Sequence, residues 1–155
     1  MKSYLDPVDL QILKILQADG RITNAELAKK IDLSQPSALQ RVRTLEKSGY
    51  IKKYAALLDA ERLGLKITVW AMISLSLHQD QPIERFRKSM QEISEVLECY
   101  HVSGEFDFLL KIMVPDIRAY ESLVREKFSR IKGIQQIKSS FVLASPKQTH
   151  ILPIP

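Results

Sequence analysis

The sequence has few of the residues on which redox, metal and membrane proteins depend. Its 155 residues include a single cysteine, Cys99, and three scattered histidines, so we expect neither an internal disulfide nor a zinc cluster. The five glycines form no phosphate-binding loop. No apolar run approaches the roughly 20 residues that span a bilayer, and the N-terminus lacks the apolar core of a signal peptide. We therefore expect a cytoplasmic protein with no membrane partner, metal or cofactor.

The pattern of an enzyme active site is also lacking. The serines have no neighbouring His and Asp or Glu in the spacing of a catalytic triad, and the carboxylates are dispersed. His101 and Cys99 share a predicted strand, where such residues more often pack than act as ligands or nucleophiles. We therefore predict that the protein is not an enzyme. An enzyme on a small α+β scaffold remains an alternative, although no nucleophile or base can be named for it.

What the sequence does have is a positive charge concentrated in its first third. The chain carries a net charge of +5. Residues 1–58 hold ten Lys and Arg against six Asp and Glu, a surplus of four, whereas residues 59–155 hold thirteen against twelve. Within residues 34–53 five basic side chains accompany one acidic side chain. A polyanionic partner is therefore expected to contact this segment first.

Residues 1–50 are predicted to form three short helices. Asp6 is a suitable N-cap followed by proline, and the first helix ends near Asp19 and Gly20. A second helix opens with a capping box at Thr23 and Glu26, and a third opens at Ser34 and ends at Gly49. The inward-facing positions are predicted to be Val8, Ile12, Ile15, Leu16, Leu27, Ala28, Ile31, Ala38, Val42 and Leu45.

From Lys66 the apolar period changes from that of a helix to the two-residue period of a strand. The pattern predicts strands over residues 66–77, 96–103, 108–114 and 134–143, with helices that begin at Asp80 and Asp116. Ile83, Phe86, Met90 and Ile93 should face inward from the first of these helices, and Ile117, Tyr120, Val124, Phe128 and Ile131 from the second. The order is βαββαβ, a ferredoxin-like plan.

The fold class is therefore α+β, with a three-helix helix-turn-helix domain (1–50) and a ferredoxin-like domain (66–155). Residues 51–65 are expected to link them as a strand over Tyr50 to Leu58 followed by a connector. Strand alternation leaves a second apolar face on the sheet, made of Trp70, Met72, Cys99, Leu109 and Met113. Because this face would be wet in a lone domain, we expect a second copy to cover it in at least a dimer.

The second and third helices have the spacing of a helix-turn-helix, whose protruding second helix can enter the major groove of DNA. Gln40 and Arg43 can make bidentate contacts to adenine and guanine, and the lysines suit phosphates. Arg41 lies beside the core side, so an intramolecular carboxylate such as Asp9 or Asp19 competes with a phosphate. The candidate DNA-binding residues are Ser34, Gln35, Pro36, Ser37, Gln40, Arg41, Arg43, Thr44, Lys47, Lys52 and Lys53. A three-helix bundle with a solvated basic face is the structural alternative.

A turn around Gly104, Glu105 and Asp107 joins two strands and forms a second candidate site. A free amino acid needs backbone donors for its carboxylate and an acid for its ammonium group, and this turn offers both. Residues 139–141 (Ser139, Ser140 and Phe141) are predicted to close such a pocket. From the residues alone the simpler interpretation is structural, with Gly104 present for a positive φ and Asp107 bonding its own turn.

The order and spacing of several motifs resemble the Lrp/AsnC family of bacterial and archaeal regulators, from about Leu5 to Pro153. The motifs are Asp9-Leu10-Gln11-Ile12-Leu13, Gly20-Arg21, Glu26-Leu27-Ala28, Leu33-Ser34, Arg41-Val42 with Leu45-Glu46, Gly49-Tyr50-Ile51 and Val102-Ser103-Gly104-Glu105-Phe106-Asp107-Phe108. The family often has glycine in the turn between the helix-turn-helix helices. Here the turn has Asp32, which also tolerates the left-handed conformation.

The resemblance implies double-stranded DNA as partner, dimers that often assemble into octamers, and an amino-acid effector bound between dimers. It reverses the structural interpretation of the hairpin and implies an effector site at Gly104, Glu105 and Asp107, with His101, Ser139, Ser140 and Phe141 as neighbours. We therefore predict a sequence-specific transcriptional regulator modulated by an amino acid. The alternative is an amino-acid sensor that acts on protein partners, which would bind ligand without salt-dependent affinity for DNA.

Overall fold

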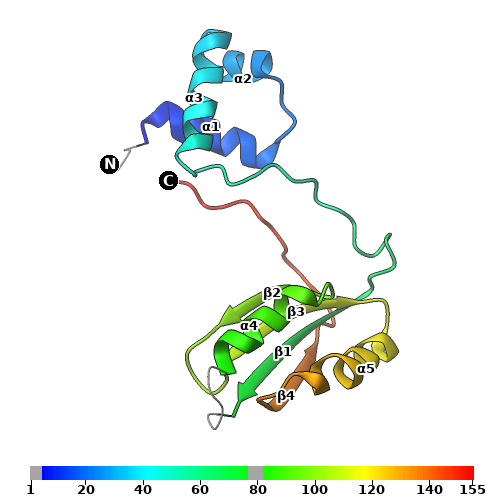
Figure 1. Ribbon diagram of the computed structural model, residues 1–155. Coiled ribbons are helices and arrows are strands. Elements are labelled where there is room, and N and C mark those ends of the chain that lie inside the picture. Colours follow the sequence, from blue (N-terminus) through cyan, green and yellow to red (C-terminus); the bar gives the residue numbers. More distant parts are fainter. Residues whose placement is uncertain (1–4, 77–81) are drawn as a thin grey trace. The chain divides into compact units, whose positions relative to one another are not determined.

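The computed structural model of the protein describes residues 5–76 and 82–155, which form two compact units (Figure 1). One unit holds Met1–Leu57 together with Lys147–Pro155, and the other holds Leu58–Pro146. The prediction placed all of residues 66–155 in one domain, whereas the structure packs the last segment with the N-terminal unit. The side-chain amide of Gln17 donates to the backbone oxygen of Leu152 (3.1 Å) and accepts from its N–H (2.9 Å).

Three helices build the N-terminal unit, as predicted: α1 (Pro7–Ala18), α2 (Asn24–Lys30) and α3 (Gln35–Lys47). Reciprocal capping boxes begin α1 at Asp6 and α2 at Thr23, and Ser34 caps α3. These caps satisfy amide donors that a helix start otherwise leaves unpaired. The buried core consists of Ile12, Leu27, Ala28, Ile31, Ala38 and Leu45.

The strand predicted over Tyr50 to Leu58 is wrong. The structure shows no regular secondary structure between Ile51 and Asp59, and the side chains of Leu57 and Leu58 are 68% and 74% exposed. A strand is stable only when its backbone groups pair with a neighbouring strand. The sheet found in the described part of the chain contains four strands, and this segment is not among them.

The second unit has the predicted βαββαβ order. It consists of β1 (Ile67–Leu75), α4 (Pro82–Glu92), β2 (Val96–His101), β3 (Phe108–Val114), α5 (Ile117–Glu126), a short 3-10 helix (Phe128–Arg130) and β4 (Ile134–Phe141). The sheet order is β2-β3-β1-β4, and every neighbouring pair is antiparallel. Asp80, the predicted start of α4, lies outside the described residues. No helix in residues 5–76 and 82–155 is long and apolar enough to cross a membrane.

Helices α4 and α5 cover one face of the sheet (Figure 1). The core between them contains Val69, Ala71, Ile73, Leu75, Phe86, Met90, Ile93, Phe108, Leu110, Ile112, Val114, Tyr120, Leu123 and Phe128. Two residues predicted to face inward are instead exposed: Ile83 by 39% and Ile117 by 63%. Both lie in the first turn of their helix. Periodicity tells which way such a side chain points, but not whether the sheet extends beneath it.

The opposite face of the sheet, here called the open face, carries Trp70, Met72, Leu109 and Met113, as predicted from alternation. Cys99 was also predicted there, but it pairs with Leu110 and lies on the helix-covered side. A register shift between Val96 and Glu98 is the cause. One extra residue in a strand reverses the alternation of every side chain after it.

Candidate DNA-binding and effector sites

Helices α2 and α3 form a tight helix-turn-helix. Asp32 in the turn has a φ of +52°, the left-handed conformation expected for a residue that replaces glycine. The Asn24 side chain, at the start of α2, donates to the backbone oxygen of Gln35 (2.8 Å). This bond joins the first residues of the two helices, and no pattern in the sequence predicts it.

The predicted DNA-binding positions form an exposed surface along α3 and beyond it. Ser34, Gln35, Pro36, Ser37, Gln40, Arg43, Thr44, Lys47, Lys52 and Lys53 are all exposed. No hydrogen bond or ion pair joins the side chains of Gln40, Arg43 or Lys47 to another residue in the described ranges 5–76 and 82–155. These three groups are therefore available to a partner, whereas the Thr44 hydroxyl donates to the Gln40 backbone oxygen (2.9 Å).

The segment that follows α3 contacts that helix through a hydrogen bond between side chains. The Tyr54 hydroxyl donates to the Glu46 carboxylate (3.0 Å). Burial and this carboxylate raise the pKa of Tyr54 to about 12, because both disfavour the phenolate. The contact holds the chain that carries Lys52 and Lys53 against α3. It depends on a pairing eight residues apart outside regular structure, for which the sequence shows no signal.

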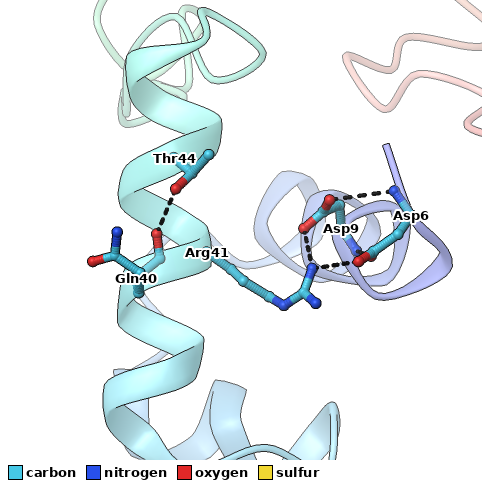
Figure 2. A network of polar contacts seen from close by, with 5 residues as sticks. All are labelled: Asp6, Asp9, Gln40, Arg41 and Thr44. Atoms are coloured by element: carbon cyan, nitrogen blue, oxygen red, sulfur yellow. Dashed lines mark hydrogen bonds and ion pairs between the residues drawn. The ribbon is translucent and has the colours of Figure 1, made fainter. Parts of the chain in front are cut away.

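Arg41 differs from its neighbours on α3 because its side chain turns toward α1 (Figure 2). Its Nη1 atom donates to Asp6 Oδ2 (2.6 Å) and to Asp9 Oδ1 (2.8 Å). Of the two carboxylates considered from the sequence, Asp9 is a partner. Asp19 instead accepts from the backbone N–H of Arg21 (3.0 Å). The structure thus places an intramolecular ion pair where the sequence left a choice between a carboxylate and a phosphate.

The carboxylate of Asp6 has two functions in this network. It accepts the backbone N–H of Asp9 (2.8 Å) as the cap of α1 and also accepts from Arg41. The hydrogen bond from the Asp9 backbone and the Arg41 guanidinium lower the pKa of Asp6, because both favour the charged carboxylate. The two carboxylates raise the pKa of Arg41 in return.

The hairpin between β2 and β3 holds the second candidate site. The carboxylate of Asp107 accepts the backbone N–H of Leu75 (2.6 Å), and the backbone N–H of Asp107 donates to Ile73 (2.9 Å). The side chain of Asp107 therefore bonds the end of β1. The structural interpretation of the sequence had expected it to bond its own turn. Gly104 has a φ of +122° with open space around it, so backbone conformation and not crowding favours glycine there.

The remaining predicted effector residues lie in two places. The His101 ring stacks on Phe108 at the hairpin end of the sheet, with ring centroids 4.9 Å apart. Residues 139–141 lie on β4 at the other edge, where they pair with residues 69–71 of β1. The strand order puts β3 and β1 between β2 and β4. Within one chain, residues 139–141 therefore lie on the edge strand opposite β2, and their closing of a pocket over the hairpin stays a prediction.

The three β4 residues also face different sides of the sheet. Ser140 pairs with Trp70 and lies on the open face, whereas Ser139 and Phe141 lie on the helix side. The Ser139 and Tyr120 hydroxyls bond each other at 2.5 Å, and Tyr120 meets Phe141 edge to face at 5.4 Å. Burial raises the pKa of Tyr120. A shallow cavity of about 360 Å³ lies beside Ser139, between α5 and β4.

One contact does join the hairpin to β4, at a position that the sequence analysis missed. Lys138 places its Nζ 5.7 Å from the ring centroid of Phe106, a cation–π arrangement. No three His, Cys, Asp or Glu side chains of the described residues are grouped as metal ligands would be.

Comparisons with known proteins match both units. Residues 5–52 match a winged helix-turn-helix DNA-binding domain, and residues 68–152 match the Lrp/AsnC ligand binding domain. The leucine-responsive regulatory protein of Escherichia coli is 41% identical over 150 residues, which cover 97% of this chain and 92% of the relative.

Solved structures agree over the same length. A transcriptional regulator from Neisseria meningitidis in complex with L-methionine is 36% identical, with a TM-score of 0.93 and coverage of 97% of both chains. An AsnC family transcriptional regulator from Agrobacterium tumefaciens is 36% identical, with a TM-score of 0.90 and coverage of 96% of this chain and 97% of that chain.

The two units define a transcription regulator in which a helix-turn-helix DNA-binding domain is joined to a ligand-binding domain. The chain belongs to the Lrp/AsnC family. The α+β fold predicted from the sequence is confirmed.

Proposed function

We propose that this protein binds specific sequences of duplex DNA through the outer surface of α3 and that an amino acid modulates this binding. The observation that carries the proposal is the row formed by Gln40, Arg43 and Lys47, which are exposed on α3 and whose side chains bond no other residue in the described part of the chain. Because duplex DNA is the proposed partner, we place the protein in the cytoplasm with the chromosome.

The residues of this surface have different expected contacts. Gln40 and Arg43 suit the edges of adenine and guanine in the major groove, where bidentate hydrogen bonds discriminate between bases. Lys47, Lys52 and Lys53 suit phosphates, which fix register but carry no base information. Residues 34–37 surround the start of α3, where the positive end of the helix dipole favours another phosphate.

We further propose that the effector is an amino acid held by the hairpin residues His101, Gly104, Glu105 and Asp107. The ligand-binding domain matched by residues 68–152 supports this proposal, as do the L-methionine complex of the Neisseria protein and the name of the leucine-responsive relative. Within one chain, residues 139–141 lie on the edge strand opposite β2. We therefore propose that the hairpin of one copy and residues 139–141 of another copy meet across an interface between them.

The open face supports self-assembly. Its apolar side chains are stabilised when a second layer covers them, and the same face of another copy would do so in a symmetric dimer. We propose that dimers assemble further, up to an octamer, and present pairs of α3 helices to spaced half-sites. An amino acid that binds one arrangement more tightly than another would shift the spacing of these helices and thereby the affinity for DNA.

Fluorescence anisotropy titrations test DNA recognition. They compare a duplex that the protein binds specifically with a duplex of the same composition and scrambled sequence, each at two salt concentrations. Arg43→Ala should weaken binding and relax base preference by about 1–3 kcal/mol, because it removes a base contact. Lys52→Ala should weaken both duplexes alike and reduce the salt slope by about one. Lys132→Ala removes an exposed charge from the other unit and serves as the control. Identical behaviour of the first two variants contradicts the proposed division of contacts.

A thermal-shift screen of the twenty amino acids tests the effector proposal. A ligand at a hundred times its dissociation constant stabilises the folded protein by about 2.7 kcal/mol, which is well resolved as a shift in melting temperature. A protein that shifts with an amino acid but shows no salt-dependent affinity for DNA would support a sensor of protein partners instead. If no amino acid shifts the melting temperature, the effector proposal fails.

A further inference from the structure

The ion network that joins α1 to α3 links residues more than 30 positions apart. Arg41 on α3 bonds Asp6 and Asp9 through a single nitrogen, at 2.6 and 2.8 Å. Asp6 and Asp9 also bond each other's backbone N–H groups in a capping box. The first turn of α1 therefore presents two carboxylates, held in place by the helix start, to one guanidinium group (Figure 2).

This network lies close to the proposed reading surface but points away from it. Successive residues of a helix are separated by about 100° around its axis, so Arg41 is rotated away from its neighbour Gln40. Its side chain is 35% exposed and already faces two negative charges. A phosphate at the same guanidinium would have to approach two carboxylates of its own charge. Arg41 is therefore poorly placed to contact DNA and well placed to orient α3.

Helix α3 is held in its unit by apolar core contacts and by the bond from Asn24 to its first residue, Gln35. Helix α3 buries Ala38 and Leu45 and packs the partly buried Val42 against the same core, and apolar contacts are not directional. The small side chain of Ala38 also leaves little to interlock with neighbouring helices. An arginine bonded to two carboxylates is directional, because its donors have fixed geometry. A small rotation of α3 would move Gln40 and Arg43 together relative to a DNA groove.

We propose that Asp6, Asp9 and Arg41 form a clamp that sets the orientation of α3, so that two acidic residues promote DNA binding. The proposal rests on the DNA-binding function proposed above. Arg41 and its carboxylates are positioning residues that hold Gln40 and Arg43 toward the bases without contacting DNA themselves.

The charge of the clamp makes the proposal easy to distinguish from simple electrostatics. Asp9→Asn removes a negative charge, so an effect of charge alone would tighten binding to a polyanion. The clamp predicts the opposite: affinity for the specific duplex falls about twofold to fivefold, the range expected for loss of a partly exposed ion pair. Asp19→Asn is the matched control, because Asp19 lies in the same unit and makes no contact with Arg41. It should bind DNA as tightly as the wild type or more tightly.

Arg41→Gln provides a second, independent variant. If Arg41 bound a phosphate, its removal would reduce the salt slope of binding by about 0.9, whereas breaking the clamp reduces affinity for the specific duplex and leaves the slope unchanged. The double variant Asp9→Asn with Arg41→Gln should bind no more weakly than Arg41→Gln alone, because both substitutions break the same network. Circular dichroism at the assay temperature confirms that each variant is folded.

Two results would overturn the clamp while leaving DNA binding intact: Asp9→Asn binding as tightly as Asp19→Asn, or a salt slope that falls by about one in Arg41→Gln. A wild-type protein without salt-dependent affinity for any duplex would instead overturn the proposed function, and with it the role of the clamp. The two failures are therefore separate outcomes of the same titrations.

Discussion

The contact between Asp107 and the end of β1 yields the most specific stability prediction. The carboxylate of Asp107 accepts the backbone N–H of Leu75 at 2.6 Å, and Leu75 is only 6% exposed. Replacing Asp107 by alanine removes the acceptor and leaves a sheltered amide without a partner. Replacing it by asparagine keeps an oxygen acceptor but removes its charge.

The structure sets the expected magnitudes. A sheltered donor left unpaired costs about 1–3 kcal/mol, so Asp107→Ala should lower the free energy of unfolding of this unit by that amount. A charged acceptor bonds about twice as strongly as a neutral one. Asp107→Asn should therefore lose about half as much. Glu105→Ala, an exposed acidic position in the same hairpin, should change stability by less than about 0.5 kcal/mol.

Urea unfolding followed by tryptophan fluorescence measures these differences. The chain has a single tryptophan, Trp70, which lies on β1 and therefore reports on the unit that contains Asp107. Equal midpoints for Asp107→Ala and the wild type would refute the proposed structural role of this carboxylate. The Asp107 side chain stabilises the end of β1 and also lies in the proposed effector site. For any amino acid that binds, the affinities of the Asp107 variants must therefore be compared at temperatures where each variant is folded.

Three further predictions concern other contacts. Lys127 holds the pKa of the Glu95 carboxyl below its ordinary value of 4.5, so the stabilisation removed by Lys127→Met is fully present above that value and is lost as the pH falls from there through the lowered pKa; a difference in urea midpoint that is as large at about pH 3 as at about pH 7 contradicts it. Asp32→Val should destabilise the N-terminal unit by about 1–2 kcal/mol because φ is positive there, whereas Asp32→Gly should not; equal midpoints refute this. Gln17→Ala should speed amide hydrogen exchange at Leu152, as mass spectrometry would show, and unchanged exchange would refute that tether.

Interactions between residues close together in the sequence determined much of the secondary structure of this protein. The caps at Asp6, Thr23 and Ser34 identify the starts of three helices, because each supplies a side-chain acceptor to free amides of the first turn. The change from a helical to a two-residue period identifies the second unit, because buried positions recur with the geometry of the element that carries them. The helix-turn-helix and the βαββαβ order could therefore be predicted from residues close together in the chain.

Tertiary structure decided the features that depend on distant partners. A register shift in β2 places Cys99 on the helix side, and alternation alone cannot reveal it. The choice of Asp6 and Asp9 over Asp19 as partners of Arg41 depends on how α1 crosses α3. The order of strands places β4 at the edge of the sheet opposite β2, and only the folded sheet brings Lys138 of β4 to Phe106 of the hairpin. In each case the energy depends on geometry between elements, which a pattern of neighbouring residues does not contain.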